Sequence, residues 1–251
     1  MSSHFNAVGF PVANIDQYWA LARRGAAAGV RNVLPEGGAV VRWAVEAGPE
    51  IWCYVDRAGE VTGAVPFFST GDVRRIAVTG AGDDPDEALE GWIDGWLEPT
   101  EDDEPYSGAF PVRVDVVNYA LVRGRLTALP SLQRIELVGL AHEADLYADE
   151  RAYAAAPGDI YHLPVGAIAS GPHLAADTDV DTFTEATALL SGRLEAARPL
   201  TNAVTGQPFW RLQLTLRGVR LHVFADRETL GGDPAAGQIL AGSFWLLGRL
   251  V

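Results

Sequence analysis

A strict alternation of apolar and polar side chains runs through residues 208–226 and constrains the fold more than any other feature of the chain. Alternate positions are apolar: Trp210, Leu212, Leu214 and Leu216, then Val219, Leu221, Val223 and Ala225. Side chains of a β-strand point in turn to the two faces of a sheet, so this period of two predicts antiparallel strands with one buried and one solvated face. Gly218 marks the bend between two of these strands.

The whole C-terminal third is predicted to be β-structure. Residues 188–196 also alternate, residues 226–237 form a polar insertion with room for one helical turn, and residues 238–251 form one bent strand or two, with Gly242 as a candidate bend. This order of strands resembles the small five-stranded barrel of the OB-fold. The resemblance implies an OB-like antiparallel β-barrel over residues 184–251.

The N-terminal part is predicted to be a mixed α+β domain. Residues 5–12 have the pattern of a strand, and a helix follows over residues 14–29, where Asn14 or Asp16 can cap the first turn and Gly29 can end the last. Three further strand patterns complete a β-α-β-β-β order and cover residues 38–48, 50–59 and 61–68.

A second unit of similar order follows, so the N-terminal part has the pattern of a duplication. Its helix is predicted over residues 83–99, because Asp84 can cap it, Pro85 suits the first helical position and Glu87 completes a capping box. Apolar side chains recur there at helical spacing: Leu89, Trp92, Ile93, Trp96 and Leu97. Strand patterns cover residues 72–82, 108–122 and 131–147, and a short helix is predicted at 149–156.

Residues 158–183 are rich in glycine, proline, aspartate and small side chains, which is typical of a linker with room for one short strand. We therefore expect two domains. An acidic α+β domain covers residues 1–157, the linker covers 158–183, and the OB-like β-barrel covers 184–251.

Charge and composition limit the function classes. The 251-residue chain has a net charge of −14, which disfavours nucleic acid and anionic membranes as partners. All 19 basic residues are arginine. A chain without lysine cannot form a Schiff base with pyridoxal phosphate or supply the lysine of a nucleotide-binding P-loop, so both sites are excluded and no cofactor is expected. Residues 1–157 carry 12 arginines against 24 acidic residues, whereas residues 158–251 carry 7 against 9.

Cys53 is the one cysteine of the chain, which excludes an intrachain disulfide, and its strand-like surroundings predict a buried, unreactive thiol. The first residues lack the pattern of a signal peptide, and no apolar run reaches membrane-spanning length. We therefore expect a cytoplasmic protein without a membrane partner, either a monomer or a homodimer.

The alternating stretch supplies a first set of candidate binding residues: Arg211, Arg217, Arg220, His222 and Phe224. In an OB-like barrel, strands two and three form the usual binding face. Arginine and aromatic side chains together can bind phosphates and stack on bases, so this face is a candidate surface for a protein partner or for single-stranded nucleic acid. The alternative is the ordinary solvated face of an antiparallel sheet.

Glu136 and His142 form a second candidate set. On an extended strand they share one face, and imidazole and carboxylate groups suit zinc or iron, so they are candidate metal ligands. The alternative is a histidine on a sheet surface and a solvated carboxylate. A metalloprotease helix is excluded, because Leu146 stands where a second histidine is required.

The sequence NAVGFPVANIDQYW at residues 6–19 resembles the opening strand and helix of the vicinal oxygen chelate superfamily. This resemblance covers residues 1–150 as two modules and implies a cleft for a metal ion or a small molecule. Metal-dependent members carry a ligand, usually histidine, on the first strand, where this chain has Asn6 or Ala7, with His4 slightly earlier. Other members bind cationic drugs in an acidic, aromatic cleft. The N-terminal part offers these tryptophans for it: Trp19, Trp43, Trp52, Trp92 and Trp96.

Two C-terminal segments, TNAVTGQPFW at residues 201–210 and AGSFWLLGRL at 241–250, resemble the end of an uncharacterised bacterial protein family that has no assigned activity. The sequence therefore predicts a non-enzymatic protein that binds a protein or a small molecule through the barrel face. The alternatives are small-molecule or metal binding in an N-terminal cleft, and binding of single-stranded nucleic acid by the barrel.

Overall fold

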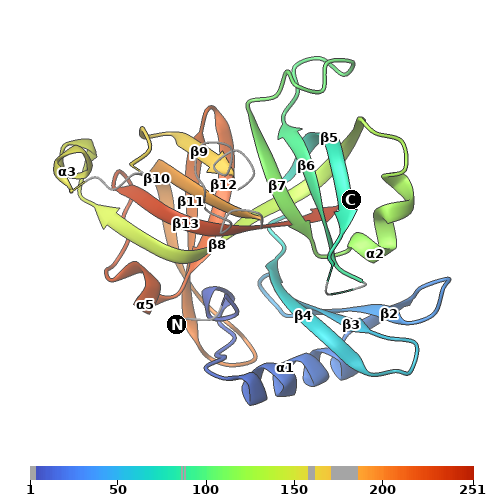
Figure 1. Ribbon diagram of the computed structural model, residues 1–251. Coiled ribbons are helices and arrows are strands. Elements are labelled where there is room, and N and C mark those ends of the chain that lie inside the picture. The colour runs from blue at the N-terminus through green and yellow to red at the C-terminus, as the bar shows by residue number, and fades with distance from the viewer. Residues whose placement is uncertain (1–3, 86, 88, 158–161, 171–185) are drawn as a thin grey trace.

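The computed structural model describes residues 4–85, 87, 89–157, 162–170 and 186–251. The fold is α+β and mostly β, as predicted, and its described strands form a four-stranded sheet and a nine-stranded sheet (Figure 1). The helices are α1 (Ile15–Ala28), α2 (Tyr119–Val122), α3 (Glu150–Ala155) and α5 (Arg227–Leu230), with 3₁₀ turns η1 (Asn6–Val8) and η2 (Arg123–Arg125).

The helix α1 begins and ends where the sequence predicts. The Asn14 side chain accepts a hydrogen bond from the Gln17 amide at 3.0 Å, and Gly29 follows the last turn. The four-stranded sheet comes next as an antiparallel meander of β1 (Val30–Val33), β2 (Ala39–Ala44), β3 (Pro49–Val55) and β4 (Val61–Phe68). The three strands predicted here match β2 to β4. The strand β1 was not predicted, and its four side chains are all exposed.

Residues 5–12 were predicted as a strand, and this prediction is wrong, because the 3₁₀ turn η1 forms there instead. Gly9, with a φ of 77°, closes the turn. The Asn6 side chain then accepts a hydrogen bond from the Val12 amide at 2.9 Å. The buried side chains of this segment include Phe5, Ala7, Val8 and Phe10. Because Ala7 and Val8 are adjacent, these side chains do not follow the period of two of a half-buried strand, and this pattern favours a turn.

The four-stranded sheet lies between α1 and the nine-stranded sheet (Figure 1). On the α1 side, Gly25 allows a close approach, since a Cβ there would lie 2.8 Å from the Cys53 sulfur. This thiol is buried, as predicted, and burial raises its pKa to about 12. On the other side, the ring of Phe68 stacks on Phe224, with centroids 4.3 Å apart.

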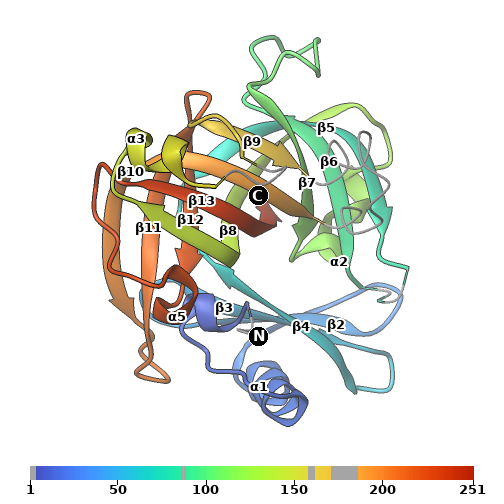
Figure 2. The ribbon, with the colours of Figure 1, turned by 60° about the vertical axis from the view of Figure 1, so that its left-hand side comes forward.

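The nine-stranded sheet closes into two rings of five strands that share β8 and β13. Its strands are β5 (Val73–Asp83), β6 (Gly91–Leu97), β7 (Phe110–Val116), β8 (Ser131–Tyr147), β9 (Ala167–Ser170), β10 (Thr187–Thr201), β11 (Pro208–Leu216), β12 (Val219–Ala225) and β13 (Ile239–Leu250). One ring runs β5-β6-β7-β13-β8 and the other runs β10-β11-β12-β8-β13. The β7–β13 and β12–β8 pairs are parallel. Figure 2 shows the rings on either side of the shared strands.

The two rings enclose one continuous hydrophobic cluster. Because β8 precedes residues 158–183 and β13 follows them, the segments on either side of the predicted linker share both a sheet and an interior. Four strands of the second ring lie within residues 184–251, where a barrel was predicted, and the fifth strand is β8.

The helix predicted over residues 83–99 is wrong, because within this range Gly91–Leu97 form the strand β6. Asp84 does accept a hydrogen bond from the Glu87 amide at 3.1 Å, but the chain then turns back to pair with β5. Side chains of β6 alternate in burial, and a Cβ at Gly95 would lie 2.7 Å from a carbonyl oxygen of β5. Gly91 and Gly95 each disfavour a helix by about 1 kcal/mol relative to alanine, so the glycines and the period of two prevail over the capping signal.

The strand predicted over residues 108–122 is wrong in its last part, because β7 ends at Val116 and Tyr119–Val122 form α2. Several other predicted elements are confirmed. The short helix at 149–156 is α3, and the turn within 226–237 is α5. One short strand, β9, forms within the predicted linker. Residues 158–161 and 171–183 of that prediction lie outside the described residues. Within the described part of the chain, no helix is long and apolar enough to cross a membrane.

Candidate functional site

A cleft of about 570 Å³ lies beside the shared strands β8 and β13, and we call it the His4 cleft. Its size is within the range of about 300–1,000 Å³ that is usual for small-molecule sites. Its walls come from the N-terminal segment, the β5–β6 turn, β6, β7, β8, β13 and the start of β10. The residues that line it are His4, Asp84, Pro85, Glu90, Trp92, Arg113, Asp115, His142, Thr187 and Trp245.

A local irregularity in β8 brings His142 to this cleft. The two neighbours of His142, Ala141 and Glu143, pair with consecutive residues of β13, so the register of the two strands shifts at His142. Such a bulge changes the direction of a side chain. The Nε2 atom of His4 lies 3.0 Å from Nδ1 and 2.9 Å from Nε2 of His142, and the rings meet edge to face.

His4 is held in its neutral form. Burial, and to a smaller extent the neighbouring His142, lowers the pKa of His4 to about 3. Its ring centroid also lies 4.7 Å from that of Trp245. Because a neutral imidazole has one donor and one acceptor nitrogen, His4 contributes hydrogen-bonding capacity to the cleft without contributing charge.

Trp245 and Arg113 are each held by a carboxylate. The indole nitrogen of Trp245 donates to Asp115 at 2.7 Å. The guanidinium of Arg113 makes two hydrogen bonds to Asp94, at 2.8 and 2.7 Å, and lies 4.1 Å from the ring centroid of Trp92. The bidentate pair with Asp94 already balances the charge of Arg113, which is the one arginine among the described residues that line the cleft.

Glu90 is the carboxyl group in the least favourable surroundings. Burial, with repulsion from Glu87, Asp84 and Asp115, raises the pKa of Glu90 to about 8. Within the part of the chain that the structure describes, no hydrogen bond to its carboxyl group offsets this cost. The carboxyl group lies against Gly63 of β4, where a Cβ would be 2.9 Å from its Oε1 atom. The cleft therefore contains a carboxyl group that is mostly protonated at pH 7.

The structure does not bring the two predicted metal ligands together. Glu136 is buried, pairs with Arg249 at 2.5 Å and accepts a hydrogen bond from the Gly71 amide at 2.6 Å, whereas His142 contacts His4. Six residues along a strand span about 20 Å, and a metal–ligand bond is about 2 Å, so one ion cannot bind both side chains. Among the described residues, no three histidine, cysteine or acidic side chains are grouped to hold a metal ion.

Two residues of the predicted barrel face are buried, so they are not available as a contact surface. Phe224 is fully buried against Phe68, and His222 is 6% exposed. Burial, then the neighbouring Arg211, lowers the pKa of His222 to about 4. These two side chains are buried because the four-stranded sheet covers this side of β12. The alternation within β12 does not indicate that a second sheet packs there.

The arginines of the predicted face are more accessible, but a carboxylate lies among them. Glu195 of β10 accepts hydrogen bonds from Gln213, at 2.6 Å, and from Thr215, and Arg220 lies 3.8 Å from it. Arg211 is half-buried, and Arg217 occupies the exposed turn between β11 and β12 with a φ of 46°. The arginines therefore do not form an uninterrupted positive surface.

Most of the residues that line the His4 cleft were not predicted as site residues. Trp92 is the one member of the predicted aromatic set that lines it. Arg113 and Asp115 alternate with buried valines in β7, a signal that two polar side chains share one face. Glu90 was not predicted as a site residue because the capping signal placed it in a helix.

Comparisons of the chain with family models, with curated proteins and with solved structures found no match. The function is therefore inferred from the cleft itself.

Proposed function

We propose that the protein binds a small organic cation in the His4 cleft, without covalent catalysis. The observation that carries this proposal is the position of Glu90, a half-buried carboxyl group that lines the cleft together with other carboxylates and two tryptophans. A positive ligand charge would favour the ionised form of Glu90 and offset the repulsion from Asp84 and Asp115.

The balance of charges supports a cation in preference to an anion. Among the described residues, three carboxyl groups line the cleft, those of Asp84, Glu90 and Asp115, while Arg113 is paired with Asp94 and His4 is neutral. An anion would meet repulsion from these carboxylates and would have no unpaired arginine in the lining. A cation would find a negative site of low dielectric constant, where electrostatic attraction is strong.

The aromatic side chains support an organic ligand in preference to a metal ion. The ring of Trp245 is fixed by its hydrogen bond to Asp115, so it offers a preformed surface to an apolar or cationic group. One face of Trp92 already has the Arg113 guanidinium over it, which shows that this ring accommodates a cation. The cleft volume of about 570 Å³ leaves room for a ligand with a ring or a short alkyl chain.

The nucleophilic side chains near the cleft favour a binding site over a site of covalent catalysis. Among the described lining residues, Thr187 carries the one aliphatic hydroxyl and none carries a thiol. Cys53 lies elsewhere in the core, with a pKa raised to about 12, so it is a poor nucleophile.

The test compares phenethylammonium with phenethyl alcohol, which has the same ring and no charge, by isothermal titration calorimetry near pH 8.5. We expect the cation to bind at least about tenfold more tightly, and Glu90→Gln to remove most of that preference. The matched control is Glu101→Gln, which neutralises an exposed carboxylate outside the cleft. Equal affinities for the two probes, or no binding of either, would refute the proposal.

The barrel face provides a second candidate function. The ring of β10, β11, β12, β8 and β13 has the strand number of an OB-type barrel, and β11 and β12 correspond to its usual binding strands. Arg198 of β10 lies opposite Arg211 of β11, so arginines extend across two strands. We propose that a protein partner or single-stranded nucleic acid would contact Arg211, Arg217 and Arg220. Binding unchanged by Arg217→Glu with Arg220→Glu would exclude this surface.

A further inference from the structure

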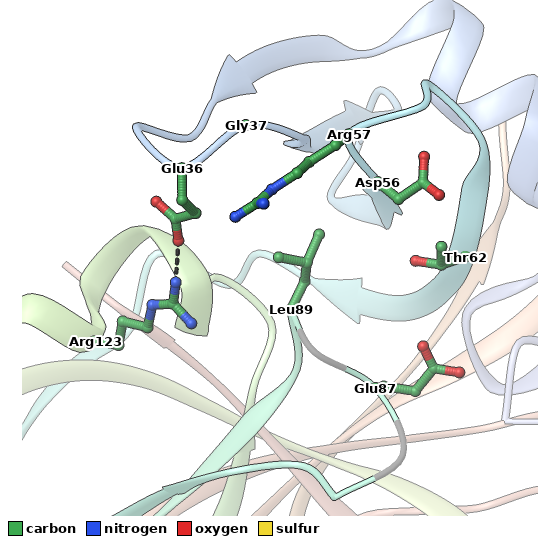
Figure 3. Close-up of a pocket in the computed structure, with 8 residues that line it drawn as sticks. All are labelled: Glu36, Gly37, Asp56, Arg57, Thr62, Glu87, Leu89 and Arg123. Atoms are coloured by element: carbon green, nitrogen blue, oxygen red, sulfur yellow. Dashed lines mark hydrogen bonds and ion pairs between the residues drawn. The ribbon is translucent and has the colours of Figure 1, made fainter.

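A second cavity, of about 490 Å³, lies between the four-stranded sheet and the η2 turn, and we call it the Arg57 pocket. It shares no lining residue with the His4 cleft. Turns of the four-stranded sheet form one wall, and the β5–β6 turn and η2 form the other. The charged residues that line it are Glu36, Asp56, Arg57, Glu87 and Arg123 (Figure 3).

One side of the Arg57 pocket carries the guanidinium groups. In Figure 3 the Arg57 side chain points across the pocket toward Glu36 and Arg123. Arg123 is already paired with Glu36 and lies 3.9 Å from Asp83. Arg57 makes no ion pair with any described residue. Its side chain lies along Gly37, where a Cβ would be 3.0 Å from Cγ of Arg57, so the turn leaves space for it.

The opposite side carries oxygen atoms. Asp56, Thr62 and Glu87 lie together on the far side of Leu89 from the two guanidinium groups (Figure 3). Asp56 uses one carboxylate oxygen to accept a hydrogen bond from the Glu60 amide at 2.9 Å, which fixes the side chain in the β3–β4 turn. Asp56 and Arg57 are consecutive in that turn and face opposite sides of one cavity.

We propose that the Arg57 pocket binds a small zwitterion such as a free amino acid. The ligand carboxylate pairs with Arg57, the ammonium group pairs with Asp56, and the hydrocarbon part contacts Leu89. An unpaired guanidinium suits a carboxylate, because its planar donors match the two oxygens. A ligand with a single charge would satisfy one side of the pocket and leave the other unpaired, so both charges are required for the full affinity.

The experiment uses L-leucine as the probe, with two relatives that each lack one charge: 4-methylpentanoate, without the ammonium group, and 3-methylbutylamine, without the carboxylate. Binding is followed by chemical-shift changes in ¹H–¹⁵N spectra of the full chain. We expect L-leucine to bind at least about tenfold more tightly than either relative. Arg57→Gln and Asp56→Asn should each weaken its binding by about the same factor.

Asp56→Asn keeps the oxygen that accepts the Glu60 hydrogen bond, so the turn should be preserved and its spectrum should resemble that of the parent. Arg151→Gln, which removes an exposed arginine of α3, is the matched control and should bind as the parent does. Equal binding of 4-methylpentanoate, or unchanged binding in both pocket variants, would overturn the proposal. Glu90→Gln should leave leucine binding unchanged, so failure at this pocket is distinct from failure at the His4 cleft.

Discussion

Two carboxyl groups, the buried Glu136 and the half-buried Glu90, have opposite surroundings. Glu136 pairs with Arg249 and accepts a hydrogen bond from the Gly71 amide. Glu90 has Glu87, Asp84 and Asp115 as neighbours, and its pKa is raised to about 8. The difference indicates that burial alone does not mark a binding site in this fold. The charge of Glu136 is already met by partners within the fold, whereas the carboxylate neighbours of Glu90 make it the candidate for a positive ligand.

The largest effect is expected where the paired carboxylate loses its partner. Arg249→Leu should lower the free energy of unfolding by about 3–5 kcal/mol, because Glu136 would remain buried without a cation. Urea denaturation at neutral pH measures this effect. Arg227→Leu breaks the exposed pair with Asp233 and should cost less than about 1 kcal/mol. Adding Glu136→Leu to Arg249→Leu should restore part of the loss, and a further loss in the double variant would contradict this account.

A smaller effect, with a defined pH dependence, is expected at Glu90. Between the usual carboxyl pKa of 4.5 and about 8, the folded protein retains a proton at Glu90 that the unfolded chain has released. The unfolding free energy therefore falls as the pH rises through this window. Glu90→Gln should remove this fall and be more stable than the parent above pH 8, by about 1.4 kcal/mol for each pKa unit of the shift at most.

Urea denaturation near pH 5, 7 and 9 measures this dependence, and Glu101→Gln again serves as the control. Equal pH slopes for Glu90→Gln and the parent would show that the Glu90 carboxyl group is ionised throughout. That result would also remove the main support for a cation site in the His4 cleft.

The smallest effect is expected at Glu195, which has partners but is not buried. Hydrogen bonds from Thr215 and Gln213 lower its pKa, so its stabilising contribution is present above the usual carboxyl pKa and is lost as the pH falls below that value. Glu195→Gln should change the unfolding free energy by less than about 1 kcal/mol at neutral pH. A loss comparable to that of Arg249→Leu would mean that hydrogen-bond partners contribute more than burial to the stabilising effect of a carboxylate. That result would contradict the comparison between Glu136 and Glu90.

The sequence predicted elements whose pattern is local. The helix α1 has a cap at Asn14 and a terminating glycine within one stretch, and most residues of β11 and β12 alternate between polar and apolar, so neighbouring residues determine both. The strand β6 was missed because its tryptophans satisfy helical spacing as well as a period of two. Its two glycines indicate a strand, since a helix tolerates them poorly and the close approach to β5 requires them.

The candidate sites depend on contacts that no local pattern encodes. His4 and His142 are separated by 138 residues, and their meeting depends on an irregularity in the pairing of β8 with β13. The burial of Phe224 depends on Phe68, from the other sheet. The residues of the Arg57 pocket come from four separate turns and from one strand. Sequence patterns identify side chains that share a face of one strand, but they do not identify which faces meet.

The sharing of β8 and β13 has a consequence for the order of events during synthesis. Both rings require β13, which follows every other described strand in the chain. The first ring therefore stays open on the ribosome while β10, β11 and β12 are still being made, even though four of its five strands have already emerged. Its unpaired strand edges are exposed throughout that interval, when pairing with a strand of another nascent chain leads to aggregation.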